Sequence, residues 1–216
     1  MPLNTAAKNT MLDSLSVITH IGIHTLTDPG VGADANTGEA TGGSPAYARK
    51  SVTWSAASGS QKASSASITW DVPAGTYGYF TLWNAATGNS NNYRGFIPFG
   101  GSSAVKGFFS VDTALNNDQF LSVAHGMANG DIVILEPVFT ETLPGGTGLV
   151  AGAPLYVVGS GTNSFKLSTT SGGAAIDLTA INGGEGYFQR LVPEVFGAQG
   201  QITANAGVLI LDSTAV

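Results

Sequence analysis

Apolar residues recur at helical spacing close to the start of the chain. The residues that fall on one face of such a helix are Ala7, Met11, Leu12 and Leu15. Either Asn4 or Thr5 can cap its first turn. A helix this short is marginal in water by itself. We therefore expect it to dock on a sheet through its apolar face.

From Val17 onward, apolar residues follow the alternation that is typical of β-strands. The expected strands of a first group are 17–25, 47–54, 67–72, 77–83 and 93–97. A second group is expected at 108–111, 119–123, 132–136, 155–159 and 164–168, and it closes with 175–178. Glycine and asparagine between them tolerate the positive φ angles of tight turns. The pattern predicts an all-β fold with a short N-terminal helix.

The first pattern returns near the C-terminus, where 201–203 and 208–211 are expected as strands. The last of these is a nearly continuous apolar run, which is typical of a central strand buried on both faces. The second group indicates a compact barrel or small sandwich. The segments before and after it are expected to form a β-sandwich-like domain.

Composition narrows the classes of function. Of the 216 residues, 10% are charged and none is cysteine. Without cysteine there is no disulfide framework, thiolate zinc site or cysteine nucleophile. A net charge of −6 with eight basic residues provides no phosphate-binding patch, which argues against nucleic acid as a partner. No apolar run approaches the ~20 residues that span a bilayer, so we expect no membrane insertion.

The low charge also bears on location and partners. Residues 1–10 lack the basic start and long apolar stretch of a signal peptide, so we expect synthesis in a cytoplasm without export. A neutral, polar surface lowers the desolvation cost of contacts. It suits a protein that works packed against copies of itself.

The loop at 28–46, which is rich in glycine, aspartate and asparagine, carries oxygen ligands at short spacing. The candidate calcium ligands are Asp28, Asp34, Asn36 and Glu39. Their order and the position of glycine do not match an EF-hand, and a solvated loop is the alternative. No other metal and no cofactor is predicted.

The remaining candidates for catalysis are few. His20 and His24 share a strand face about 13 Å apart along the chain, too far for one metal ion. His125 precedes a glycine and is expected to cap a turn. The chain has no nucleophile elbow, P-loop, dinucleotide fingerprint or metalloprotease motif, so we expect no enzymatic activity. Paired carboxylates that meet only in space stay an open alternative.

Aromatic residues allow two interpretations. Those that could form a platform for sugar rings are Tyr77, Tyr79, Trp83 and Tyr93. The alternative is that they fill the core, as aromatic residues of strands usually do. The second group of strands is expected to bury its own aromatic residues: Phe108, Phe109, Phe120, Phe139, Tyr156 and Phe165.

Several turn-and-strand motifs resemble a family of structural proteins of tailed bacteriophages, described as tail fibre, minor tail or virion proteins, especially in phages of actinobacteria. The motifs are HIGIHT at 20–25, DPG at 28–30, TGGSPAYAR at 41–49, VPAGT at 72–76 and LWNAATG at 82–88. The resemblance as a whole includes the closing segment from Phe196 to Leu211 and extends over about half of the chain. None of the motifs is a catalytic signature.

The segment between these motifs resembles a second module that is common in phage tail proteins. Its motifs are AHGMANGD at 124–131, LPGG at 143–146, YVV at 156–158, NSFKLS at 163–168 and GGAAIDL at 172–178. The two resemblances together imply a domain at 107–189 inserted into a discontinuous domain of 1–106 plus 190–216. Insertion at a loop tip is physically ordinary because the two ends of such a loop lie close together.

The resemblance implies a non-enzymatic component of a virion, most naturally a minor tail or tail fibre protein that assembles symmetrically with itself and with other virion proteins. Because tail fibres are commonly three-fold, it favours a trimer. A head decoration or minor capsid protein is one alternative. A module of the tail that binds host-surface glycan is another.

Overall fold

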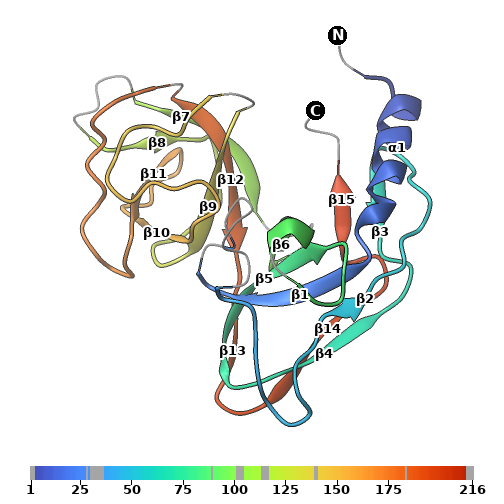
Figure 1. Ribbon diagram of the computed structural model, residues 1–216. Coiled ribbons are helices and arrows are strands. Elements are labelled where there is room, and N and C mark those ends of the chain that lie inside the picture. Colours follow the sequence, from blue (N-terminus) through green and yellow to red (C-terminus); the bar gives the residue numbers. More distant parts are fainter. Residues whose placement is uncertain are drawn as a thin grey trace. The chain divides into compact units, whose positions relative to one another are not determined.

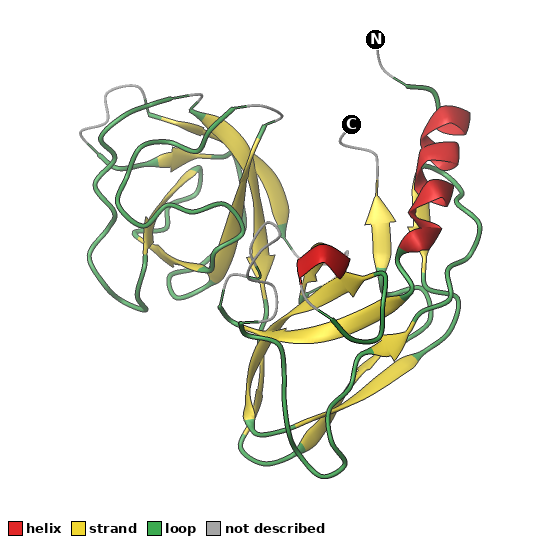
Figure 2. Cartoon of the chain, in the orientation of Figure 1, coloured by secondary structure: helices red, strands yellow, loops and turns green. Residues whose placement is uncertain are grey.

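The computed structural model describes residues 3–27, 29, 37–88, 90–100, 105–112, 117–138, 141–182 and 184–212. Strands dominate these residues, and the single α-helix among them is N-terminal, so the all-β prediction is confirmed (Figures 1 and 2). The chain divides into two compact units. The first consists of residues 1–102 and 193–216 and the second of residues 103–192, close to the boundaries that the sequence suggests.

The first unit is built around β5. Its elements are α1 (Thr5–Ser14), η1 (Leu15–Val17), β1 (His20–Thr25), β2 (Lys50–Ser51), β3 (Gln61–Ala63), β4 (Ile68–Val72), β5 (Gly75–Trp83), η2 (Ser90–Asn92), β6 (Tyr93–Pro98), β13 (Glu194–Phe196), β14 (Gly200–Ala204) and β15 (Ile210–Asp212). β1 pairs with one edge of β5 and with β2, while β6 and β13 share the other edge of β5. β14 pairs with β4, and β15 with β3.

The point of insertion lies on one edge of β5. Pro98 at the end of β6 pairs with Tyr79, and Glu194 at the start of β13 pairs with Tyr77. The chain therefore leaves this sheet and returns to it at positions two residues apart. That is the geometry in which a second unit can be inserted without disturbing the first.

Side chains from all the sheets of the first unit share one core. Trp70 of β4 is fully buried, and its Nε1 donates a hydrogen bond of 2.9 Å to the carbonyl oxygen of Ile21 in β1. Phe80 of β5 packs against Trp70 and Phe99, with ring centroids 5.6 Å and 4.5 Å away. The buried aromatic residues thus connect the layers that the strands form.

The helix docks differently from the prediction. Asn4 caps it, with Oδ1 accepting a 2.9 Å hydrogen bond from the amide of Ala7. Leu12 is buried, but Met11 and Leu15 are 49% and 37% exposed. The prediction that this apolar face is buried is therefore wrong for Met11 and Leu15.

Polar anchors explain this orientation. Asn9 accepts a hydrogen bond from the amide of Ser60. Asp13 accepts a hydrogen bond from the amide of Ala57 and forms an ion pair of 2.7 Å with Lys62. These bonds turn the Asn9–Leu12–Asp13 side of α1 toward the sheet, since residues three and four apart share a helix face.

The last strand is also placed differently. Leu209 and Leu211 are buried in the first unit, whereas Val208 is 42% exposed. β15 pairs with β3 and with no other strand in the described part of the chain. The prediction of a central strand buried on both faces is therefore wrong: this is an edge strand with one buried face.

The second unit is a closed antiparallel barrel, one of the two forms that the sequence predicts. Its strands are β7 (Lys106–Val111), β8 (Phe120–Leu121), β9 (Ile132–Pro137), β10 (Leu155–Val158), β11 (Ser164–Ser168) and β12 (Glu185–Leu191), closed in the order β10-β11-β8-β7-β12-β9. Residues 175–178 form no strand, and β12 closes the barrel instead. The sequence prediction omits β12.

Phenylalanine rings fill the barrel. Four of them are buried and form a row in which each ring contacts the next: Phe109, Phe120, Phe165 and Phe188. The centroids of neighbouring rings are 5.3 to 5.5 Å apart. Gly107 pairs with Phe188 across the strands, and a Cβ there would meet the Phe188 ring at 2.6 Å. Glycine opposite phenylalanine therefore leaves room for the rings.

Not every aromatic residue that was assigned to this core is found buried in it. Phe108 is 45% exposed on the outer face of the barrel, so its assignment to the core is wrong. Tyr156 is half-buried, and Phe139 lies outside the described residues. Phe108 and Phe109 point to opposite faces because side chains alternate along a strand.

Candidate functional site

The four aromatic residues singled out as a sugar platform are buried. Tyr79 and Trp83 have no exposed surface, and Tyr77 and Tyr93 are 2% and 8% exposed. Tyr77 donates a hydrogen bond to the carbonyl of Pro73, and Trp83 packs edge-on against Tyr93. These residues therefore belong to the core, and none of them presents a ring face to solvent.

Trp83 forms part of a buried charge network. The Arg49 guanidinium lies 3.3 Å above the Trp83 ring. It binds the Glu39 carboxylate through two bonds of 2.7 Å, from Nε to Oε1 and from Nη2 to Oε2. The side chains of Arg49 and Glu39 are 6% and 11% exposed, so each charge is compensated by the other away from water.

Residues on β1 and on the segment 37–49 complete this network. Tyr47 donates a 3.0 Å hydrogen bond to Glu39 and accepts one from the amide of Ile23. Burial, reinforced by the neighbouring Glu39 charge, raises the pKa of Tyr47 well above its ordinary value. A Cβ at Gly22 would lie 2.9 Å from Oε1 of Glu39, so glycine lets the carboxylate lie against β1.

One of the four calcium candidates, Glu39, belongs to this network. The carboxylate of Glu39 is engaged by Arg49 and Tyr47. Asp28, Asp34 and Asn36 lie outside the described residues. Among the residues that are described, no three His, Asp or Glu side chains come close enough together to hold a metal ion.

The histidines take structural positions. His24 is buried on β1 with its ring nearly perpendicular to that of Tyr79, and His20 contacts Thr19. His125 accepts a hydrogen bond from the amide of Met127 through Nδ1. Because Nδ1 accepts, Nε2 carries the proton and donates to the carbonyl of Ser164. His125 therefore closes a turn, as predicted.

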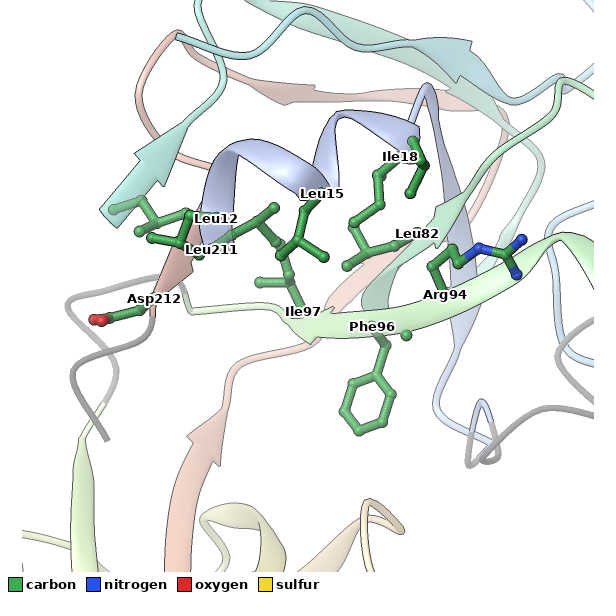
Figure 3. A pocket seen from close by; sticks show the side chains of 12 residues that line it. Leu12, Leu15, Ile18, Leu82, Arg94, Phe96, Ile97, Leu211 and Asp212 are labelled. Carbon is green, nitrogen blue, oxygen red and sulfur yellow. The ribbon is translucent and has the colours of Figure 1, made fainter. Parts of the chain in front are cut away.

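An apolar groove beside the helix is the main candidate interaction surface. It has a volume of about 370 Å³. Side chains of α1, η1, β6 and β15 contribute to its lining: Leu12, Leu15, Val17, Phe96, Ile97 and Leu211. Figure 3 shows Arg94 and Asp212 at opposite ends of the row of apolar side chains.

Exposed apolar side chains extend the groove. Leu15 and Val17, both in its lining, are 37% and 54% exposed. Met11, 49% exposed, lies one helical turn before Leu15 on the same side of α1. We call Met11, Leu15 and Val17 the apolar strip. Met11 and Leu15 belong to the helix face that the sequence predicts to be covered by the sheet.

The barrel exposes an aromatic pair that sequence analysis does not identify. Phe108 on β7 and Tyr187 on β12 are directly paired across the strands, and their ring centroids are 5.8 Å apart. They are 45% and 40% exposed. The signal in the sequence is the alternation of Gly186, Tyr187 and Phe188, which places Tyr187 on the face opposite to Phe188.

No helix in the described part of the chain combines the length and apolar character that crossing a membrane requires. Comparisons with models of protein families, with curated proteins and with solved structures found no match.

Proposed function

We propose that this protein is a non-enzymatic structural component of a bacteriophage virion, a minor tail or tail fibre protein that assembles through contacts between copies of itself and with other virion proteins. The observation that carries this proposal is the apolar strip beside the groove. Contiguous apolar side chains on a protein surface mark sites of contact with other molecules. The low charge of the chain favours extensive contacts of that kind.

The motifs that resemble virion proteins supply the second support. Gly22, Tyr47, Arg49 and Trp83 belong to these motifs and meet in the buried charge network. The contacts of these residues hold the loop before β2 against the sheet. Residues with this role maintain a shape, which is what a structural component contributes.

The resemblance favours three copies, and we also propose assembly in the virion after synthesis in the bacterial cytoplasm, without a cofactor. A decoration or minor protein of the head is the alternative within this class. Both locations require the protein to copurify with intact particles.

Quantitative mass spectrometry of purified phage particles tests the proposal. The phage whose genome encodes this chain should contain it in a fixed number of copies per particle, at a constant ratio to the major tail protein. Separated heads and tails should then assign it to one of the two. Recovery of the chain only from the particle-free lysate would contradict the proposal.

Glycan binding is a second candidate function because of the exposed Phe108–Tyr187 pair. Aromatic rings bind the apolar faces of sugars, and Glu136, exposed and directly paired with Tyr187, can accept hydrogen bonds from hydroxyl groups. Sedimentation with insoluble cell-wall polysaccharide tests it. Tyr187→Ala should abolish cosedimentation, whereas Val123→Ala, at an 85% exposed site of the same unit, should leave it unchanged.

A further inference from the structure

The small sheet that β4 and β14 form is open along β14. All five residues of β14 pair with β4, and within the described part of the chain its backbone makes no hydrogen bond to any other segment. In an antiparallel strand, the N–H and C=O groups of alternate residues point away from the paired neighbour. The open edge of β14 therefore presents backbone donors and acceptors to which a further strand can be added.

This edge lacks the features that protect other strands at sheet edges in the first unit. Short strands, charged side chains, proline and bulges discourage pairing with another chain. Each of β2, β6, β13 and β15 contains a charged residue: Lys50, Arg94, Glu194 and Asp212. In addition β2 has two residues, and β6 ends in proline and pairs with β5 through a register shift. The sequence of β14, GQITA, contains neither a charge nor a proline.

The residues of β14 match those of a second β14 that runs antiparallel to it. A two-fold axis at Ile202 places Gln201 of each copy opposite Thr203 of the other, and Gly200 opposite Ala204. Directly opposite side chains point to the same face of a sheet. The exposed Gln201 and Thr203 therefore meet on the outer face, while the buried Ile202 and Ala204 lie on the inner face. No charged residue lies within this overlap of five residues.

The side chains on the outer face are oriented by β4 and keep capacity for the contact. Nε2 of Gln201 donates a 2.8 Å hydrogen bond to Asp71, and the hydroxyl groups of Thr203 and Thr69 are 2.9 Å apart. An amide group has two N–H donors, and a hydroxyl group accepts two hydrogen bonds. Gln201 can therefore donate its second N–H to Thr203 of another copy, and the two-fold axis forms this bond twice. These polar pairs favour a second β14 over an arbitrary extended segment.

We infer that two copies of this chain associate by pairing their β14 strands, which joins two β4–β14 sheets into one continuous sheet. The inference rests on the proposed function in that both require self-association, and it adds the strand, the register and the symmetry. It is compatible with the trimer that the resemblance favours, because assemblies with dihedral symmetry contain two-fold and three-fold axes together.

Cysteine cross-linking tests the pairing and its register, because the chain has no cysteine of its own. Full-length Gln201→Cys and Thr203→Cys are mixed in equal amounts under reducing conditions and then oxidised. Directly opposite positions are close enough for a disulfide, whereas position 203 of one copy lies diagonally from position 203 of the other, at roughly 7–8 Å. On non-reducing gels the mixture should therefore give a cross-linked dimer in several times the yield of either variant alone.

Light scattering over a dilution series measures the association itself. The wild type should reach twice the monomer mass. Gln201→Lys/Thr203→Lys places lysine opposite lysine twice, which should raise the dissociation constant about 10-fold. The matched control Ser51→Lys/Thr53→Lys adds the same charge at the same spacing, at exposed sites on and beside β2, and should keep the wild-type mass.

Two results would overturn the inference, whether or not the protein occurs in particles. One is a yield of cross-linked dimer that is equal in the mixture and in the single variants, since it would show that positions 201 and 203 are not opposite each other. The other is a wild type that keeps the mass of a monomer, which would leave the open edge of β14 to a strand of another protein.

Discussion

At the scale of the residue, the ion pairs of the first unit hold separate segments of the chain together. Glu39 attracts attention in the sequence as an oxygen ligand for calcium, yet its carboxylate is bound by Arg49. The two residues are ten positions apart, and nothing in their spacing predicts the pair. They meet because the segment 37–49 folds over β1, where Gly22 leaves room for the carboxylate.

Removing one partner of this ion pair should destabilise the fold strongly. Glu39→Gln leaves the Arg49 guanidinium buried over Trp83 without its counter-charge, and we expect a loss of about 3 kcal/mol in the free energy of unfolding. Urea denaturation measures this loss. The double variant Glu39→Gln/Arg49→Met should lose less than the sum of the single variants, because no unpaired charge stays buried. Additive losses would show that the two side chains do not depend on each other.

The Asp13–Lys62 pair should make stability depend on pH. The hydrogen bond from Lys62, together with that from the Ala57 amide, holds the pKa of Asp13 below its ordinary value of 3.8. A carboxyl with a lowered pKa in the folded state stabilises the protein above the unfolded value, and this contribution is lost as the pH falls through the folded value. The melting temperature of wild type should therefore exceed that of Asp13→Asn at neutral pH, and the difference should shrink below pH 3.8.

Salt provides the control for Asp13, whose side chain is 49% exposed. Added salt should reduce the difference at neutral pH, since ions screen exposed charges. A difference between wild type and Asp13→Asn that is the same at neutral and at acidic pH would show that the charge of Asp13 does not stabilise the fold.

At the scale of the element, strand pairing explains both the insertion and the errors in the sequence prediction. The alternation of apolar residues locates most strands, including β1, β4, β5, β9 and β11. It does not reveal β12, where Gly186 takes an inward position and Tyr187 an outward one. A glycine that makes room for Phe109 looks like a break in the apolar pattern, because the pattern contains no information on the opposite strand.

The second unit should be removable. Replacing residues 107–189 by a short Gly/Ser linker joins ends that meet the same edge of β5 two residues apart. The shortened chain should therefore fold, with the far-ultraviolet circular dichroism of a β protein and cooperative thermal unfolding. Failure of the shortened chain to unfold cooperatively would show that the first unit needs the barrel for its stability.

The final strand should be required on one face only. Leu209→Ala removes a fully buried side chain and should cost about 2–5 kcal/mol in the free energy of unfolding. Val208→Ala is the matched control at a 42% exposed site, and its effect should stay within about 0.5 kcal/mol. Denaturant unfolding compares the two. Equal losses would restore the expectation of a strand buried on both faces.

At the scale of the whole molecule, the sequence predicts the all-β fold class and the second group of strands, but not the groove beside α1. Alternation and turn residues are local signals, so they predict an all-β chain with a distinct segment after Phe108. The groove depends on how α1, β6 and β15 come together, and these elements are far apart in the sequence (Figure 3). The helix shows why such surfaces escape prediction: its apolar face is visible in the sequence, but the polar anchors at Asn9 and Asp13 decide which side is covered.

The central claim is that the protein works as a symmetric building block of a particle. Electron cryomicroscopy of the intact phage tests it most directly, because the β-barrel and the sheet around β5 can each be recognised in a density map. The account predicts copies related by the symmetry of the particle, with the apolar strip beside α1 covered by another protein chain. A particle map without this chain, or one in which its copies stand isolated with that strip open to solvent, would contradict the account.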